Sequence, residues 1–354
     1  MKHRVLTILR NCVPSIVSRM SISIGALFTN KIVSAAATSH YLAAYSARTG
    51  LYTYISPIYM GLSDTVWSLA GIFCGEKDRR ALDELQKITV YIGFSITLAV
   101  GLILFLFAPF IAELFIDKDD AQTYALIIEA MRAFAIGVPL NHLFYSFTYY
   151  LMGVGRLNAA NVFLSMISFT LIVPVVWVMV KIFGGSGSWI SEPVTLFILL
   201  IGAGLYIAMQ KGGEGVTKRL LLPSNLVAAP INEINVSVYS LEEVAQISER
   251  AKIFCQENNI DTKETNTVSR CIEKLGANIL NRGFADGKKH ALDLRVILDD
   301  EGITLRFRDD CPQFNIIDHC NANDNADELS LIIKSAKYAS YSGILGTNNL
   351  IIKI

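Results

Sequence analysis

The chain has 354 residues, of which 52% are hydrophobic and only 18% are charged, and its formal net charge is zero. This composition is too apolar for a uniformly soluble protein, and no segment concentrates the basic residues that a nucleic-acid partner requires. The sequence therefore excludes nucleic-acid binding and predicts a membrane-embedded part followed by a soluble part.

The N-terminus starts with Lys2, His3 and Arg4, but Arg10 and Arg19 interrupt the apolar run that a signal peptide needs. We therefore expect no cleaved signal peptide. The cysteines form no C-x-x-C pair and lack the spacing of a zinc site, which predicts reduced thiols that bind no metal. They are Cys12, Cys74, Cys255, Cys271, Cys311 and Cys320.

Six stretches reach the roughly 20 apolar residues that a helix needs to cross a bilayer. They are residues 12–33, 42–74, 89–113, 121–151, 159–182 and 187–209. Each stretch contains one proline, namely Pro14, Pro57, Pro109, Pro139, Pro174 and Pro193. Proline removes a backbone hydrogen bond, so each span is expected to bend, either as a broken transporter helix or as ordinary helix irregularity.

Basic residues in the short connections predict the orientation of these spans. One side carries Lys2, Arg4, Arg10, Lys77, Arg79, Arg80, Lys87, Arg156, Lys211, Lys218 and Arg219, and the other carries Lys31, Lys118 and Lys181. The richer side is predicted to be cytoplasmic. With six spans, both termini and the C-terminal domain would then lie in the cytoplasm of a multi-pass inner-membrane protein.

Ionisable residues inside the spans are costly and typically face a cavity or a partner. They are Arg19, Arg48, Asp64, Glu129, Arg132, His142 and Glu192. Glu129 and Arg132 lie three residues apart, on one helix face, which predicts a local structural ion pair. Asp64 is interpreted either as a cation or proton site or as a partner of Arg19 or Arg48. His142, near Pro139, is expected to be a satisfied polar residue rather than a proton relay.

Four segments of the apolar part carry further motifs. They are VWSLAGIFCGEKDRRALDELQK (66–87), FIAELFIDKDD (110–120), GVPLN with LMGVGRLN (137–158), and IVPVVWVMVKIFGGSGSW (172–189). Taken in order, these segments resemble the multidrug and toxic compound extrusion (MATE) transporters. The resemblance covers residues 10–209 and implies an all-α six-helix bundle that corresponds to the second of the family's two bundles.

This resemblance implies a protein embedded in membrane lipid that exports a small organic cation or drug and is driven by an ion gradient. Because one bundle should not complete alternating access, the partner would be a separately encoded six-helix half or a second copy; otherwise the chain is a truncated remnant. Asp64, Glu129, Arg132, His142 and Glu192 are the transport candidates. The acidic residue that the family often carries in the first helix of this half is absent from residues 12–33, which leaves the coupling ion open.

Residues 210–235 combine glycine, proline and charge and read as a linker between a 1–209 bundle and a 236–354 soluble domain. Beyond the linker, the patterns predict strands and helices in an α+β two-layer domain. The expected elements are a strand at 235–240, helices at 241–258 and 267–284, a hairpin at 292–310 that turns at 300–302, a helix at 324–338 and a strand at 348–354.

This order resembles the histidine-kinase-like ATPase domain, and in particular the anti-sigma-factor kinases. The family's first motif is Glu-x-x-x-Asn, whose asparagine holds magnesium. Asn278 matches that asparagine, whereas Lys274 occupies the usual position of the catalytic base and Glu273 is one residue early. One residue on a helix is a 100° rotation, so no catalytic residue is assigned.

The second motif supplies an aspartate for the adenine and a glycine for close backbone approach. Asp309 matches the aspartate, and Cys311 stands where glycine is usual. The glycine-rich lid should fall near residues 325–334, which lack glycine and contain Asp327 and Glu328. The resemblance thus implies a degenerate site for ATP and magnesium at Asn278, Asp309 and Cys311.

The sequence therefore favours half of an antiporter with a regulatory ATP-binding domain, a transporter rather than an enzyme. The alternative is a membrane-anchored anti-sigma-factor-like serine/threonine kinase or protein-binding signalling module with a regulatory protein partner. Lys274 counts against the kinase form of that alternative.

Overall fold

The computed structural model describes residues 20–35, 38–76, 78–210, 221, 232–284, 288, 290–299, 302–322, 328–344 and 346–354. The chain divides into two compact units, Met1–Ala228 and Ala229–Ile354, which we call the helical unit and the sheet unit. Several residues considered above, namely Pro14, Arg19, Asp300, Glu301 and Asp327, lie outside the described residues.

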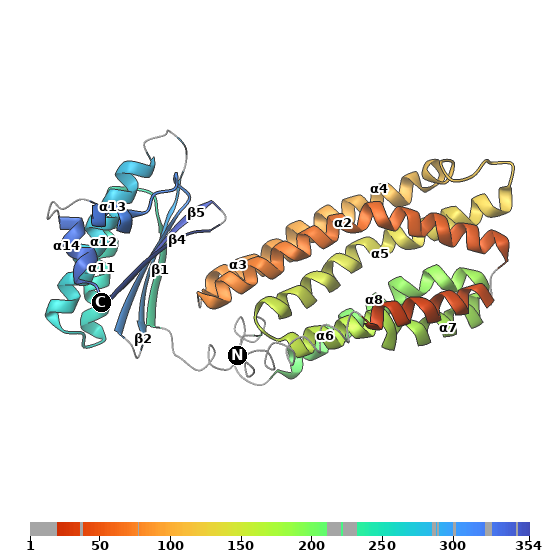
Figure 1. Ribbon diagram of the computed structural model, residues 1–354, viewed down its shortest axis with the longest axis horizontal. Coiled ribbons are helices and arrows are strands. Elements are labelled where there is room, and N and C mark those ends of the chain that lie inside the picture. The colour runs from red at the N-terminus through yellow and green to blue at the C-terminus, as the bar shows by residue number, and fades with distance from the viewer. Residues whose placement is uncertain are drawn as a thin grey trace. The chain divides into compact units, whose positions relative to one another are not determined.

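The described part of the helical unit consists of helices that run back and forth along one direction (Figure 1). In chain order they are a helix over 20–35, α2 (Ser39–Gly75), α3 (Arg79–Ile88), the π-helical turn η1 (Thr89–Gly93), α4 (Phe94–Ala112), α5 (Ala121–Gly153), α6 (Leu157–Ser165), the π-helical turn η2 (Met166–Thr170), α7 (Ile172–Phe183), the 3₁₀ turn η3 (Gly184–Ser186) and α8 (Gly187–Met209).

The helix that contains the expected span 89–113 begins ten residues earlier, at Arg79. Asp78 caps it, because its Oδ1 accepts a hydrogen bond of 2.9 Å from the backbone N–H of Ala81. Leu82 and Leu85 are buried. A search for continuous apolar runs misses α3 because it is amphipathic, with charged residues opposite this narrow apolar stripe.

A sharp reversal separates α7 from α8, and these two helices pack against each other. Gly184 adopts a φ of 61°, a conformation that side chains strongly disfavour. Consequently the chain turns back within the three residues of η3 and starts α8 at Gly187.

Three runs within the described residues are long and apolar enough to cross a membrane, judged by length and composition: Arg79–Ala112, Ala121–Gly153 and Leu157–Met209. The third run contains the reversal at η3 and therefore two of the six expected spans. The other two expected spans correspond to the helix over 20–35, of which 16 residues are described, and to α2, which carries Arg48 and Asp64.

The backbones of α2 and α5 approach closely at Gly153. A Cβ atom added there would lie 2.6 Å from the Cβ of Ala70 and 2.8 Å from the carbonyl oxygen of Trp67. Small residues at such contacts are typical of helices packed in membranes. Four of the expected prolines, Pro57, Pro109, Pro139 and Pro193, lie inside helices, and Pro174 lies in the first turn of α7.

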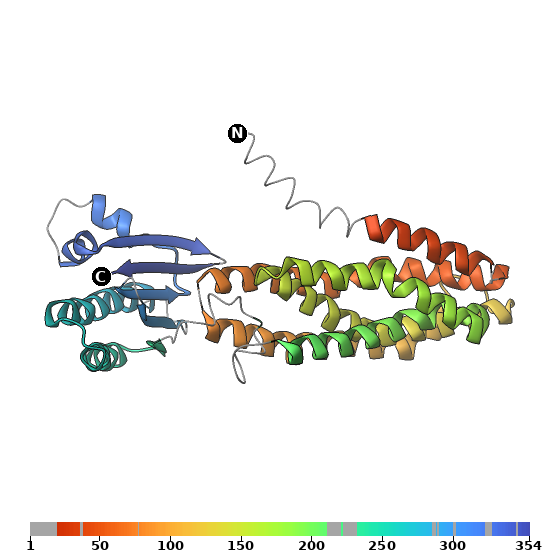
Figure 2. The same ribbon diagram turned by 90° about the horizontal axis from the view of Figure 1, so that it is seen from below.

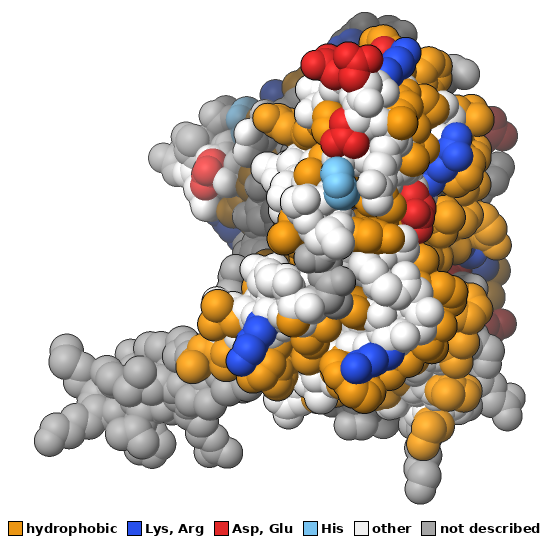
Figure 3. Space-filling view, turned by 90° about the vertical axis from the view of Figure 1, so that its right-hand side faces the viewer, with side chains coloured by type: hydrophobic (Ala, Val, Ile, Leu, Met, Phe, Trp, Pro, Cys, Tyr) orange, Lys and Arg blue, Asp and Glu red, His pale blue; other side chains and the backbone are white. Residues whose placement is uncertain are grey.

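Large apolar side chains cover much of the outer surface of the helical unit. Figure 3 shows this from the end at which α2 begins and α4 ends, where the charged side chains gather in a few places. On α4 the exposed residues include Leu102, Ile103, Leu106, Phe107 and Phe110. A surface of this kind suits contact with lipid or with further helices.

The sheet unit is an α+β layer of one antiparallel sheet with helices on one face (Figures 1 and 2). Its elements are β1 (Asn232–Val238), α11 (Leu241–Glu257), α12 (Thr262–Gly283), β2 (Leu292–Asp299), β3 (Gly302–Asp309), α13 (Ile316–Ala322), α14 (Glu328–Ser335), β4 (Tyr338–Ile344) and β5 (Thr347–Lys353). The strand order is β1-β2-β3-β5-β4.

The sheet unit differs from the sequence prediction at its edges. The linker was expected to reach residue 235, but β1 begins at Asn232, because this residue already pairs with Leu298 of β2. The helix expected over 324–338 ends at Ser335, because Tyr338 starts β4, which pairs with β5. The short helix α13 was not anticipated. The predicted hairpin turn lies where Gly302 adopts a φ of 119°.

Candidate functional site

A polar centre lies inside the helical unit, where α2, α5 and α8 meet. Arg48 of α2 forms an ion pair with Glu192 of α8. The other carboxylate oxygen of Glu192 accepts a hydrogen bond of 3.0 Å from the side-chain amide of Asn141 on α5. Arg48 is only 8% exposed, and its guanidinium carbon lies 5.6 Å from the centre of the Phe134 ring. The carboxylate of Glu192 therefore joins three helices.

His142, one residue beyond Asn141, is buried and has a partner at each ring nitrogen. Nε2 lies 3.1 Å from the carbonyl oxygen of Thr89, and Nδ1 lies 3.3 Å from the hydroxyl oxygen of Ser146. The Ser146 hydroxyl lies 3.1 Å from that of Ser63 on α2. This arrangement is that of a satisfied polar side chain next to the π-helical turn η1.

The ion pair predicted between Glu129 and Arg132 does not form. Glu129 instead accepts a hydrogen bond of 3.2 Å from the indole N–H of Trp189, whereas the Arg132 guanidinium lies 5.2 Å from the centre of the Phe105 ring. The two side chains share a face of α5, but α8 and α4 offer each of them a separate partner. Tertiary contacts therefore override the spacing.

Asp64 does not pair with Arg48, which is engaged with Glu192. Both residues lie on α2, and their separation of 16 positions corresponds to roughly 24 Å along the helix axis. The Asp64 residue is exposed, and its side chain has no bonding partner among the described residues. The other proposed partner, Arg19, lies outside those residues.

The three residues predicted to bind nucleotide line one cavity of the sheet unit. Asn278 comes from α12, Asp309 ends β3 and Cys311 follows it, and together they border a space of about 230 Å³. The other lining residues are Ile279, Arg282, Gly283, Pro312, Gln313, Phe314, Ile316, Tyr341, Asn348 and Leu350.

Asn348 of β5 holds the wall of this cavity together. Its side-chain amide donates to the Oδ1 of Asp309 at 2.7 Å and to the carbonyl oxygen of Cys311 at 3.1 Å. Its Oδ1 accepts from the Tyr341 hydroxyl at 2.6 Å and from the backbone N–H of Phe314 at 3.1 Å. The Asp309 Oδ1 also accepts from the Cys311 backbone N–H at 3.1 Å. One oxygen of Asp309 is thus fully used in fixing the loop.

Two further features of the cavity suit a nucleotide. The Oδ1 of Asn278 is buried and has no hydrogen-bond partner among the described residues. Such an orphaned oxygen is a suitable ligand for magnesium, which prefers oxygen donors. The guanidinium of Arg282 lies 3.5 Å from the centre of the Phe314 ring and supplies positive charge to the same wall. These residues fit an anionic ligand that carries magnesium.

Glu273 and Lys274 point away from this cavity. Glu273 accepts a hydrogen bond of 2.9 Å from the Ser248 hydroxyl of α11, and Lys274 forms an ion pair of 2.8 Å with Glu328. Arg270 contacts the same carboxylate at 2.9 Å. Hydrogen bonds from Lys274 and then Arg270 lower the pKa of Glu328. Neither Glu273 nor Lys274 is one of the described residues that line the cavity.

Sequence reasoning missed Asn348, Arg282 and Tyr341 in the cavity wall, and it missed Arg48 as the partner of Glu192. The sequence does contain a signal for Asn348. Two asparagines, Asn348 and Asn349, stand at the start of an otherwise apolar strand, and buried amides require hydrogen-bond partners.

Comparison with known families matches residues 14–178 of the helical unit to the MatE family model. A comparison with curated protein sequences returned no match. Among solved structures, an inward-facing multidrug resistance MATE family transporter of the MOP superfamily is 22% identical, with a TM-score of 0.52 over 65% of this chain and 50% of that one.

An outward-facing structure of such a transporter is 23% identical, with a TM-score of 0.53 over 64% of this chain and 48% of that one. A mutant of the Vibrio cholerae MATE transporter VcmN is 14% identical, with a TM-score of 0.52 over 60% of this chain and 49% of that one. The chain thus spans about half the length of these transporters. At these identities the likeness establishes the fold.

Proposed function

Because residues 14–178 match the MatE family model, we propose that the helical unit is one half of an ion-gradient-driven exporter of small organic solutes. The observation that carries this proposal is the buried centre of Arg48, Glu192 and Asn141. Charged groups inside a membrane bundle are expensive and mark ion or substrate paths. A second six-helix unit, from another chain or a second copy of this one, completes the path, since the match covers only 50% of the solved transporter's length.

Glu192 is the group of this centre that can exchange a proton. Proton uptake by its carboxylate removes the negative charge that holds Arg48, while Asn141 can still donate to the neutral acid. Loss of the ion pair loosens the contact of α2 with α8, and loss of the proton restores it. Such a two-state contact couples a proton gradient to helix movement.

Transport by the full chain in proteoliposomes tests this role. We expect a pH gradient to drive export of a fluorescent organic cation, and we expect Glu192→Gln to reduce the rate at least tenfold. Glu84→Gln is the matched control, because Glu84 is exposed, pairs with Lys87 and lies outside the polar centre. Full activity of the Glu192→Gln variant would remove Glu192 from the mechanism. If the wild-type chain self-associates in detergent yet transports nothing, pairing of two copies does not complete the transporter.

For the sheet unit we propose binding of ATP with magnesium in the cavity of Asn278 and Asp309, as regulation rather than as the energy source. The cavity suits this ligand because Asn278 offers an orphaned oxygen and Arg282 a positive charge. The second oxygen of Asp309 accepts no hydrogen bond from the described residues and is available to an amine such as that of adenine. Cys311 lines the cavity at the position where the ATPase domains that this unit resembles carry glycine.

Binding of a fluorescent ATP analogue to the full chain in detergent tests the site. A hydrogen bond to a charged group contributes about 1.5–3 kcal/mol, so Asp309→Asn should weaken binding by about tenfold to a hundredfold. Asn278→Ala should weaken binding only when magnesium is present. Asp293→Asn on β2, exposed and outside the cavity, should bind as the wild type does. Equal affinity in all these proteins would refute the assignment.

The kinase alternative is disfavoured by the positions of Glu273 and Lys274. Ser248 holds the carboxylate of Glu273 on the α11 side, and Lys274 is engaged with Glu328. No described carboxylate other than Asp309 lines the cavity, and Asp309 is tied to Asn348. Phosphorylation of a partner protein by the full chain would reverse this ordering, whereas a chain that binds no nucleotide would leave a protein-binding role.

A further inference from the structure

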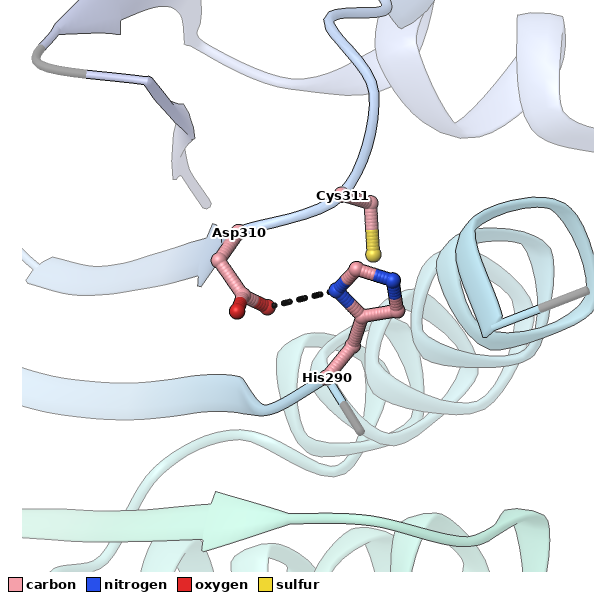
Figure 4. Close-up of side chains that lie close together, drawn as sticks. All are labelled: His290, Asp310 and Cys311. Carbon is pink, nitrogen blue, oxygen red and sulfur yellow. Dashed lines mark hydrogen bonds and ion pairs between the residues drawn. The ribbon is translucent and has the colours of Figure 1, made fainter. Parts of the chain in front are cut away.

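Three side chains of metal-binding type converge beside β3 of the sheet unit (Figure 4). They are His290, which precedes β2, and Asp310 and Cys311, which follow β3. One ligand atom from each, a ring nitrogen, a carboxylate oxygen and a sulfur, lies within 4.8 Å of the others. Sequence spacing could not reveal this group, because the pairing of β2 with β3 brings the positions together.

The separations suit one tetrahedral ion. Zinc bonds of about 2.0–2.1 Å to nitrogen and oxygen place two such ligands roughly 3.3 Å apart, and a 2.3 Å bond to sulfur widens the distance only slightly. The His290 Nδ1 lies 3.1 Å from the Asp310 Oδ1. Because the three ligand atoms already lie within 4.8 Å of one another, a shift of the sulfur by roughly 1 Å brings all three within reach of one ion.

The surroundings leave room for that movement and for an ion to enter. Gly283 at the end of α12 lies against the Cys311 side chain, where a Cβ atom would collide with the sulfur. A second cavity, of about 380 Å³, is lined by His290, Asp310 and Cys311 and gives access to the group. The Asp310 side chain is 53% exposed, whereas that of His290 is only 7% exposed. The His290 side of the group is thus buried, whereas the Asp310 side faces solvent.

We propose that His290, Asp310 and Cys311 bind a zinc-type divalent ion. Imidazole, thiolate and carboxylate are all zinc ligands, and three protein ligands leave the fourth position for water or an exogenous ligand. Binding releases the thiol proton of Cys311 to solvent and shifts the ring proton of His290 to Nε2. The thiolate and the carboxylate together carry two negative charges, which balance the ion.

The ion site adjoins the proposed nucleotide cavity but does not depend on it. Cys311, Pro312, Gln313 and Asn348 line both spaces, whereas His290 and Asp310 line only the second among the described residues. Ion binding is therefore tested in the absence of nucleotide.

Cobalt(II) titration of the reduced full chain in detergent tests the site, because a cobalt–thiolate bond gives a charge-transfer band and tetrahedral cobalt gives intense visible bands. We expect one equivalent to bind, and zinc to displace it. Cys311→Ser should abolish the charge-transfer band, and His290→Ala and Asp310→Asn should each weaken binding at least tenfold. Cys320→Ser, which changes another cysteine of the sheet unit, should leave the spectrum unchanged.

Alkylation of the wild-type chain gives a second readout that does not rely on a folded variant. Zinc should slow the modification of Cys311 at least tenfold, as measured by peptide mass spectrometry, and leave the rates of the other cysteines unaltered. The proposal is overturned if no charge-transfer band appears, if the band survives in Cys311→Ser, or if zinc leaves the Cys311 alkylation rate unchanged.

Discussion

Breaking the ion pair between Arg48 and Glu192 should destabilise the helical unit more than removing the whole pair. Arg48→Met leaves the Glu192 carboxylate with only Asn141 as a partner, and Glu192→Met leaves a guanidinium that is 8% exposed without its carboxylate. Removing one member of a buried pair typically costs about 3–5 kcal/mol. Replacing both members with apolar groups of similar size is often neutral, because neither desolvated charge remains.

The assay is the thermal unfolding of the detergent-solubilised chain, followed by loss of the monodisperse species. With about 2–4 °C per kcal/mol for a unit of this size, each single variant should lose roughly 6–20 °C. The double variant should lose less than either single variant. Glu84→Gln removes an exposed ion pair with Lys87 and should shift the transition little, since such pairs contribute about 0–1 kcal/mol.

Additive losses in the double variant would refute this reasoning, because they would show that the two side chains act independently. A single variant as stable as the wild type would also refute the reasoning, because it would show that leaving one buried charge without its partner costs no stability.

Three further measurements address packing and ionisation. Gly153→Ala should cost about 1–3 kcal/mol in thermal unfolding because α2 leaves no room for the methyl group, whereas Gly61→Ala, with no atom within 4 Å, should be neutral or slightly stabilising. Burial raises the pKa of Cys271 to about 12. The contribution of this thiol to the free energy of unfolding is therefore fully present below the ordinary thiol pKa and is lost as pH rises toward 12. Cys271→Ala should flatten that alkaline decline in denaturant titrations. The lowered pKa of Glu328 acts oppositely: its contribution is present above the ordinary carboxyl pKa and is lost as pH falls through the folded value, so Glu328→Gln should give a shallower acid decline than the wild type. Unchanged alkaline and acid profiles would show that these two groups ionise alike in the folded and unfolded chains.

The helices and strands were largely predictable because their patterns are local. Apolar runs placed α4, α5 and α8 to within a few residues, and alternation placed β2 and β3. The misses have local causes too: α3 is amphipathic rather than apolar, and the segment of β4 contains serine and glycine that weaken its strand pattern.

Pairings between distant side chains were not predictable in the same way. The spacing of Glu129 and Arg132 on α5 suggested an ion pair, but Trp189 and Phe105 decided where each side chain goes. The partner of Glu192 lies on α2, far away in the sequence, so only the packing of the bundle reveals it. In the sheet unit, a family resemblance brought Asn278 and Asp309 together, yet no pattern indicated that Asn348 joins the wall.

The position of Asn348 has a consequence for biosynthesis. The loop after β3 is fixed by an amide on β5, so Asp309 and Cys311 acquire their final arrangement only after β5 has been made and has paired with β3. Because β5 follows the helical unit in the chain, this wall of the cavity is arranged only after the residues of the helical unit have been synthesised.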